Sequence, residues 1–306
     1  MRHAFVHALE KEMSKDKDIM LLTADLGFGA LDKIKEKYPK QFVNVGVAEQ
    51  NMMGLAAGLA LNGKKVWAYS IIPFSVYRPY EQIRNDIAYH NLNVKIVGVG
   101  SGFSYSNQGM SHWGLEDLAL MGTLPAMTVV APGDPIEVEC AVKELSNTSG
   151  PGYLRLGKAG EKELNKRPLN YELGKANYVR EGKDLSLIST GNMLETALEV
   201  ADELAKKDLF ADVISMHTFK PIDRKAVIDS AMKKVVCTLE EHMTHGGLGG
   251  AVADIIAQSP YKPKLKIFGV ANNADYVRVA GSQAYVRDKV GLTKEKIAEY
   301  IQRCMI

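Results

Sequence analysis

The sequence has few cysteines and no long apolar run. Its three cysteines, Cys140, Cys237 and Cys304, are far apart and form no C-x-x-C pair, which fits reduced thiols rather than a disulfide framework. No stretch approaches the roughly 18–20 apolar residues that a membrane-spanning helix needs. Residues 1–18 are charged and amphipathic and lack the apolar core of a signal peptide. These absences predict a soluble protein of the cytoplasm.

The chain also lacks an excess of either charge. Its 38 basic and 36 acidic residues give a formal net charge of +2 and are spread along the sequence, so nothing indicates binding to nucleic acid or to an anionic membrane. A chain of 306 residues with 46% hydrophobic residues can bury a large core and usually forms two domains.

Short β-branched runs alternate with helical patterns in the first half of the chain. Strands are predicted at 19–26, 42–46, 66–71, 94–100, 127–132 and 152–157, and helices at 49–61, 79–91, 112–124 and 134–147. Asp134 followed by Pro135 is typical of a helix start. Because the strands read as continuous apolar runs, we expect an α/β fold whose mostly parallel sheet is covered by helices on both faces.

Residues 158–184 are polar, rich in Lys, Gly and Asn, and break this alternation. A second alternation follows, with strands predicted at 185–190, 211–219, 235–241 and 264–270, and helices at 192–208, 223–234, 246–258 and 293–303. The sequence therefore predicts a first domain at 1–165 and a smaller α/β domain at 180–306.

Several glycine-rich or polar motifs resemble nucleotide-binding or metal-binding motifs only in part. Residues 58–65 nearly match a phosphate-binding P-loop, but Lys65 replaces Ser/Thr and the segment ends a helix. The runs GVGSGF (98–103) and HGGLGG (245–250) have the wrong spacing for a dinucleotide fingerprint and favour tight turns. EEHMTH (240–245) offers His and Glu ligands for a metal, or a polar loop before the next helix.

Five segments in order carry the strongest signal. They are NVGVAEQNMMGLAAGLAL (44–61), PFSVYRPYEQIRND (73–86), GFSYSNQGMSHWGLED (102–117), TVVAPGDPIE (128–137) and GPGYLRLGK (150–158). Together they resemble the transketolase superfamily over its pyrimidine-binding and C-terminal domains, and most of all its separately encoded C-terminal halves. The same landmarks occur in 1-deoxyxylulose-5-phosphate synthases and in the beta chains of 2-oxoacid dehydrogenases.

Glu49 is the residue that this resemblance makes most important. It matches the glutamate that bonds the pyrimidine ring nitrogen of thiamine diphosphate and favours the imino tautomer, so the resemblance implies a catalytic and cofactor-binding role. An acid in an apolar pocket suits this task because desolvation raises the pKa of a carboxyl group. The alternative is an acid that is favoured at a helix start by the helix dipole.

Three further residues match the cofactor site. Phe74 matches the ring that stacks on the aminopyrimidine, and Tyr77 matches a neighbouring aromatic of that pocket. Both could instead be ordinary core aromatics. Asp25, at a strand end where open α/β sheets present ligand groups, matches an aspartate near the cofactor, with a turn-capping role as its alternative.

The resemblance also implies sugar-binding residues. His112 matches a histidine that contacts the carbonyl and hydroxyl groups of bound sugar, and Arg155 a strand position that holds substrate phosphate. The chain departs from the family at two places: Gln108 replaces an aspartate that reads a sugar hydroxyl, and uncharged Gly100 or Ser101 replaces a basic phosphate contact. These departures make a free sugar, a nucleotide-linked sugar or another acceptor alternatives to a phosphorylated ketose.

The family motif that binds Mg²⁺ and diphosphate, a G-D-G followed by an asparagine ligand, is missing. We therefore expect a second, N-terminal transketolase chain to hold Mg²⁺ and diphosphate, with two copies of this chain in an α2β2 assembly. The predicted activity is transfer of a two-carbon ketol unit between small sugars. Alternatives are a 2-oxoacid dehydrogenase beta chain, a deoxyxylulose-phosphate-synthase-like enzyme, or a non-catalytic regulatory homologue.

Overall fold

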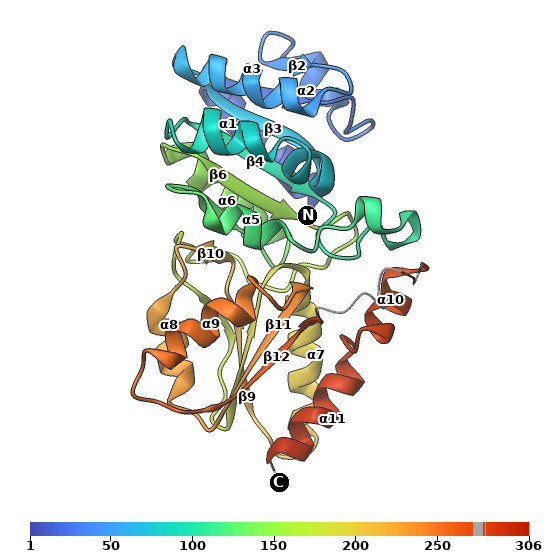
Figure 1. Cartoon of the computed structure of the whole chain (residues 1–306), viewed down its shortest axis with the longest axis vertical. Helices are drawn as coiled ribbons and strands as arrows, with labels where there is room; N and C mark the ends of the chain where they lie inside the picture. Colours follow the sequence, from blue (N-terminus) through green and yellow to red (C-terminus); the bar gives the residue numbers. More distant parts are fainter. Residues whose placement is uncertain (272–277, 279, 306) are drawn as a thin grey trace.

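The computed structural model describes residues 1–271, 278 and 280–305, and its two mostly parallel sheets lie one above the other in Figure 1. In the first sheet all neighbouring strands are parallel except β10 and β5. Its strands lie in the order β10 (Thr218–Lys220), β5 (Thr128–Val130), β6 (Gly152–Leu156), β4 (Val94–Val99), β3 (Lys65–Ile71), β1 (Ile19–Thr23) and β2 (Phe42–Asn44). The predicted α/β fold is confirmed.

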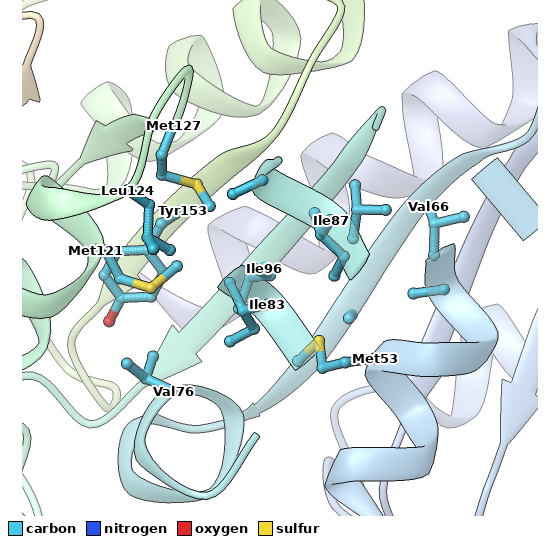
Figure 2. Packing of buried hydrophobic residues seen from close by; sticks show 14 of the residues in the cluster. Met53, Val66, Val76, Ile83, Ile87, Ile96, Met121, Leu124, Met127 and Tyr153 are labelled. Atoms are coloured by element: carbon cyan, nitrogen blue, oxygen red, sulfur yellow. The ribbon is translucent and has the colours of Figure 1, made fainter. Parts of the chain in front are cut away.

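Helices cover both faces of this sheet because successive strand residues point to opposite sides. Leu21 belongs to one apolar core and Leu22 to the other. The first core lies under α1 (Arg2–Lys15), α2 (Asp32–Lys37) and α6 (Pro135–Asn147), and the second under α3 (Glu49–Leu61), residues 73–88 and α5 (Asp117–Thr123). Figure 2 shows the second core, where Met53 and Ile83 pack close to Ile96 of β4.

The second sheet is smaller and is built in the same way. Its strands lie in the order β12 (Lys264–Val270), β11 (Val235–Met243), β8 (Leu185–Ser189), β9 (Ala211–Ser215) and β7 (Asn177–Arg180), with only β7 antiparallel to its neighbour. One face packs on α7 (Leu194–Ala205) and α11 (Lys294–Met305), and the other on α8 (Arg224–Ala231) and α9 (Leu248–Ala257). A short helix, α10 (Gln283–Lys289), precedes α11.

Two strands depart from the predicted layout. The segment predicted as one strand at 211–219 is divided, since β9 stays in the second sheet whereas β10 pairs antiparallel with β5 of the first. β7 lies inside the polar segment 158–184, where no strand was expected, and pairs with β9. As an edge strand it keeps polar, half-buried residues, which hide the alternation typical of a strand.

The start of α6 is set by local chemistry. As predicted, Asp134 caps α6, and its side chain accepts the Glu137 N–H at 2.8 Å. The helix predicted at 79–91 is instead a single α-turn, α4 (Tyr80–Gln82), followed by a π-helix over Ile83–Ala88.

No helix in the described part of the chain is long and apolar enough to cross a membrane.

Candidate functional site

Glu49 is the first residue of α3, just after the carboxyl end of β2. Gly46 makes the intervening turn with a φ of +75°, which favours glycine. The Asn44 side chain accepts the N–H of Gly46 at 3.0 Å and that of Asp25 at 2.9 Å, which ties this turn to the end of β1. Glu49 is only 2% exposed, and Arg78 Nη1 donates a hydrogen bond to its Oε2 at 2.7 Å. The fold thus buries one carboxylate at the sheet edge and pairs it with one cation.

Phe74 and His112 lie beside this ion pair. The Arg78 guanidinium lies over the Phe74 ring, 4.6 Å from its centroid, a favourable cation–π geometry. The His112 ring meets Phe74 edge-on, with 5.3 Å between ring centroids. The structure therefore brings Glu49, Phe74 and His112 together through Arg78, which sequence reasoning missed. Arg78 lies four residues after Phe74, a spacing that places both side chains on one side of a helical turn and could have indicated that Arg78 belongs to the site.

Three hydrogen bonds fix the position of the Tyr77 side chain. Its hydroxyl accepts the N–H groups of Leu115 and Glu116 at 3.0 and 3.1 Å and lies 2.9 Å from Glu116 Oε2, to which it donates. Burial raises the pKa of Tyr77 well above its usual value and also raises the pKa of Glu116. Tyr77 therefore serves as a hydrogen-bond donor and not as a base near neutral pH.

A largely apolar cavity of about 500 Å³ opens beside Tyr77. It is lined by Pro73, Tyr77, Met110, Ser111, Trp113, Leu115, Glu116 and Leu120. A cavity of this size and character suits a small organic ligand.

Gln108 and His112 lie on the loop after β4. Two 3₁₀ turns, Ser106–Gln108 and Met110–His112, are joined at Gly109, whose φ of +79° favours glycine. Gln108 is exposed, whereas His112 is half-buried and its Nδ1 lies 3.0 Å from the Ser111 hydroxyl. The loop presents both polar side chains, with His112 nearer to Phe74.

Asp25 is exposed at the end of β1, in the left-handed region with a φ of +53°. Its Oδ1 accepts a hydrogen bond from Asn44 Nδ2 at 3.2 Å, and its N–H donates to Asn44 Oδ1. Asp25 thus lies next to the turn that leads to Glu49, and its contacts are those of a turn-capping residue.

Arg155 is buried and makes its hydrogen bonds within the chain. It is 1% exposed; its Nε donates to Asp117 Oδ2 at 2.8 Å, and its Nη2 donates to the carbonyls of Gly114 and Glu241 at 2.7 and 3.1 Å. Tyr153 donates to the same Asp117 oxygen at 2.6 Å. Arg155 therefore joins β6, α5 and β11, whereas its Nη1 is buried with no hydrogen-bond partner among the described residues.

Arg155→Met is accordingly expected to destabilise the chain by about 3–5 kcal/mol, because it leaves the carboxylate of Asp117 buried and unpaired. Urea denaturation measures this, with Arg167→Met as the control. Arg167 pairs with Glu139 and Glu163 at the surface, so its loss should cost less than about 1 kcal/mol. Equal stability of the two variants, with selective loss of activity on phosphorylated sugars for Arg155→Met, would restore the phosphate-binding role.

Residues 240–243 of the segment EEHMTH are buried at the end of β11, whereas Thr244 is half-buried and His245 is exposed in the turn that follows. Glu240 accepts the N–H groups of Leu248 and Gly249 at 2.7 and 2.8 Å, and burial raises its pKa to about 8. Burial lowers the pKa of His242 to about 4. The described residues contain no group of three or more His, Cys, Asp or Glu side chains that could hold a metal ion. These side chains instead join β11 to its neighbours.

Comparison with known proteins identifies the two domains. Residues 1–160 match the transketolase pyrimidine binding domain, and residues 174–297 match the transketolase C-terminal domain. The 6-deoxy-6-sulfo-D-fructose transketolase subunit of Clostridium sp. (strain MSTE9) is 36% identical over 97% of this chain and 92% of that subunit. An apulose-4-phosphate transketolase subunit of Phocaeicola vulgatus is 35% identical over 97% of this chain and 95% of that subunit.

A solved structure described as a split gene transketolase, an inactive beta4 tetramer, superimposes with a TM-score of 0.88 at 35% identity and covers 99% of this chain and 97% of that one. A 1-deoxy-D-xylulose-5-phosphate synthase of Crocosphaera subtropica is 32% identical, but the alignment spans only 47% of that enzyme. Since both domains match and the transketolase subunits align over nearly their whole length, this chain belongs to the transketolase family and corresponds to its separately encoded C-terminal subunits.

Proposed function

We propose that this chain, with an N-terminal partner chain, forms a thiamine-diphosphate-dependent transketolase of the cytoplasm that transfers a two-carbon ketol unit from a ketose to an aldose. The observation that carries the proposal is the buried carboxylate of Glu49, paired with Arg78, whose guanidinium lies over the Phe74 ring next to His112. When bound, thiamine diphosphate supplies the carbanion chemistry of this reaction, and the protein orients the cofactor and sets its protonation.

The residues present fit the pyrimidine half of that cofactor. Glu49 would hold a proton at the pyrimidine ring nitrogen, Phe74 would stack on the ring, and Tyr77 and Asp25 would border it. Glu49 is nearly fully buried and Phe74 is half-exposed, which suits a carboxylate shielded from water and a ring open to a ligand. Since Arg78 occupies Oε2 of Glu49 and covers Phe74, a pyrimidine ring must share or displace it.

His112 and Gln108 would contact the sugar. His112 would donate to the carbonyl oxygen of the sugar and could donate to or accept from a hydroxyl group, because a neutral imidazole has one donor and one acceptor nitrogen. Gln108, in place of an acid, would offer both a donor and an acceptor to one hydroxyl group.

The partner chain would hold the diphosphate and most of the Mg²⁺ ligands. Support comes from the surface of α3: a side chain at Gly54 or Gly58 would meet no atom within 4 Å, and Leu61 and Val47 are 68% and 74% exposed. This side of α3 is thus open in the single chain, and the N-terminal chain of an α2β2 assembly would pack against it.

We expect this chain to make little use of a phosphate group on the substrate. Gly100 and Ser101, at the position of a basic contact, are uncharged and buried, and Arg155 is occupied by Asp117. We expect kcat/KM to differ by less than about 150-fold between a sugar and its phosphate, because one charged hydrogen bond contributes about 1.5–3 kcal/mol. The named substrates of the two relatives carry a sulfo or a phosphate group, so both classes should be assayed. A preference above about a thousandfold would contradict this prediction.

The product distinguishes the alternatives. The reconstituted two-chain complex should convert a ketose and an aldose into a new pair of sugars without releasing carbon dioxide. Carbon dioxide from a 2-oxoacid would indicate a dehydrogenase or synthase activity, and no turnover of any donor by a cofactor-loaded complex would favour a regulatory homologue.

A further inference from the structure

Glu241, near the end of β11, carries a fully buried carboxylate that the site described above does not use. Arg287 of α10 donates to it from Nε at 2.7 Å and from Nη2 at 3.0 Å. Gln283, also on α10, and Asn192, just before α7, donate to the same carboxylate. A buried charge is strongly unfavourable unless it is paired and fully hydrogen-bonded, so this cluster fixes the position of the Glu241 side chain tightly.

The Glu241 side chain packs directly under the loop that carries Gln108 and His112. A Cβ atom placed on Gly102 would lie 2.4 Å from Glu241 Cγ, so the loop backbone rests on the acid at this point. Gly102 and Gly114 exchange N–H to carbonyl hydrogen bonds of 2.9 and 3.1 Å, which close residues 102–114 into a loop with a narrow base. Glu241 therefore supports the base of the loop.

Other contacts attach the same loop to the second domain. The Ser106 hydroxyl donates to the Gly281 carbonyl, immediately before α10, at 2.8 Å. Phe103 and Trp113 meet edge-on, 5.1 Å apart at 87°, and both belong to the apolar core of the second domain. In Figure 1 the green loop leaves the first sheet and extends toward α10. The sugar-binding loop is thus held by the second domain, although it follows a strand of the first.

We propose that Glu241 is a positioning residue for loop 102–114 and that the C-terminal domain uses it to hold His112 at the substrate. The inference rests on the proposed function for the role of His112, but the support of the loop by Glu241 does not. Misplacement of a reacting group by about 1 Å can lower a rate about a hundredfold, so a loop that carries such a group needs a rigid support.

The test is the double variant Glu241→Gln/Arg287→Met in the complex with the partner chain. It removes both charges together, so no lone charge remains buried. Hydrogen exchange followed by mass spectrometry should show faster exchange across residues 102–114. The kcat for ketol transfer should fall at least tenfold, while thiamine diphosphate affinity, which depends on Glu49 and Phe74 in the first domain, changes less than threefold.

Lys233→Met is the matched control. Lys233 pairs with Asp212 at the opposite end of the same sheet and is also largely buried, so its loss tests general destabilisation of the domain. Exchange of residues 102–114 and kcat should remain at wild-type values. Unchanged exchange in the double variant, or equal effects from Lys233→Met, would overturn the proposal. If the wild-type complex transfers no ketol unit, the proposed function fails, and the exchange data still decide the role of Glu241.

Discussion

Glu49→Gln is expected to lower turnover by about 10²–10⁴-fold while the protein stays folded and assembled. The carboxylate is 2% exposed and is paired with Arg78, which lies over the Phe74 ring next to His112, and loss of an acid–base group costs about this factor. Folding should survive because the glutamine carbonyl can still accept the Arg78 hydrogen bond and the Arg78 side chain is 46% exposed. Steady-state kinetics of the purified complex measure the effect.

The competing explanation is that Glu49 only stabilises the start of α3. Glu195→Gln is the matched control, because Glu195 lies in the first turn of α7 in the other domain. A dipole interaction contributes about 0.3–1 kcal/mol to stability and nothing to turnover. If Glu49→Gln behaves as Glu195→Gln does, with near-normal turnover and a small loss of stability, the catalytic assignment is wrong.

Much of the fold could be predicted because it depends on local patterns. The apolar runs that became β1, β3, β4 and β6 are buried on both faces, and such strands read as continuous hydrophobic segments. The start of α6 at Asp134 and Pro135 follows from capping chemistry over three residues. β10 could not be predicted, because its partner Val130 lies in the other domain and nothing local distinguishes it from β9.

In the candidate site too, local motifs could be predicted and contacts between distant residues could not. The ordered motifs around Glu49, Phe74 and His112 predicted residues that the fold does bring together. The interaction of Arg78 with Glu49 spans 29 residues of sequence, and that of Arg155 with Asp117 spans 38. Each ion pair joins residues that are far apart in the sequence, so sequence reasoning missed Arg78 and named Arg155 without finding its partner Asp117.

The second large effect expected concerns the chain on its own, which should neither bind thiamine diphosphate tightly nor transfer a ketol unit. Its pyrimidine pocket offers one charge-assisted hydrogen bond, about 1.5–3 kcal/mol, and one stacking contact, about 0.5–1.5 kcal/mol. Association costs at least about 4 kcal/mol, which leaves at most about 0.5 kcal/mol and therefore binding far weaker than millimolar. Competition from Arg78 for both Glu49 and Phe74 weakens it further.

The central claim is that the cofactor site is divided between this chain and the N-terminal chain. Calorimetry tests it most directly, by titrating thiamine diphosphate with Mg²⁺ into this chain, into the N-terminal chain, and into their mixture. We expect tight, Mg²⁺-dependent binding only in the mixture, together with co-elution of the two chains in equal stoichiometry and the appearance of ketol transfer. Micromolar, Mg²⁺-dependent binding by this chain alone would contradict the account, because the diphosphate site would then lie within this chain.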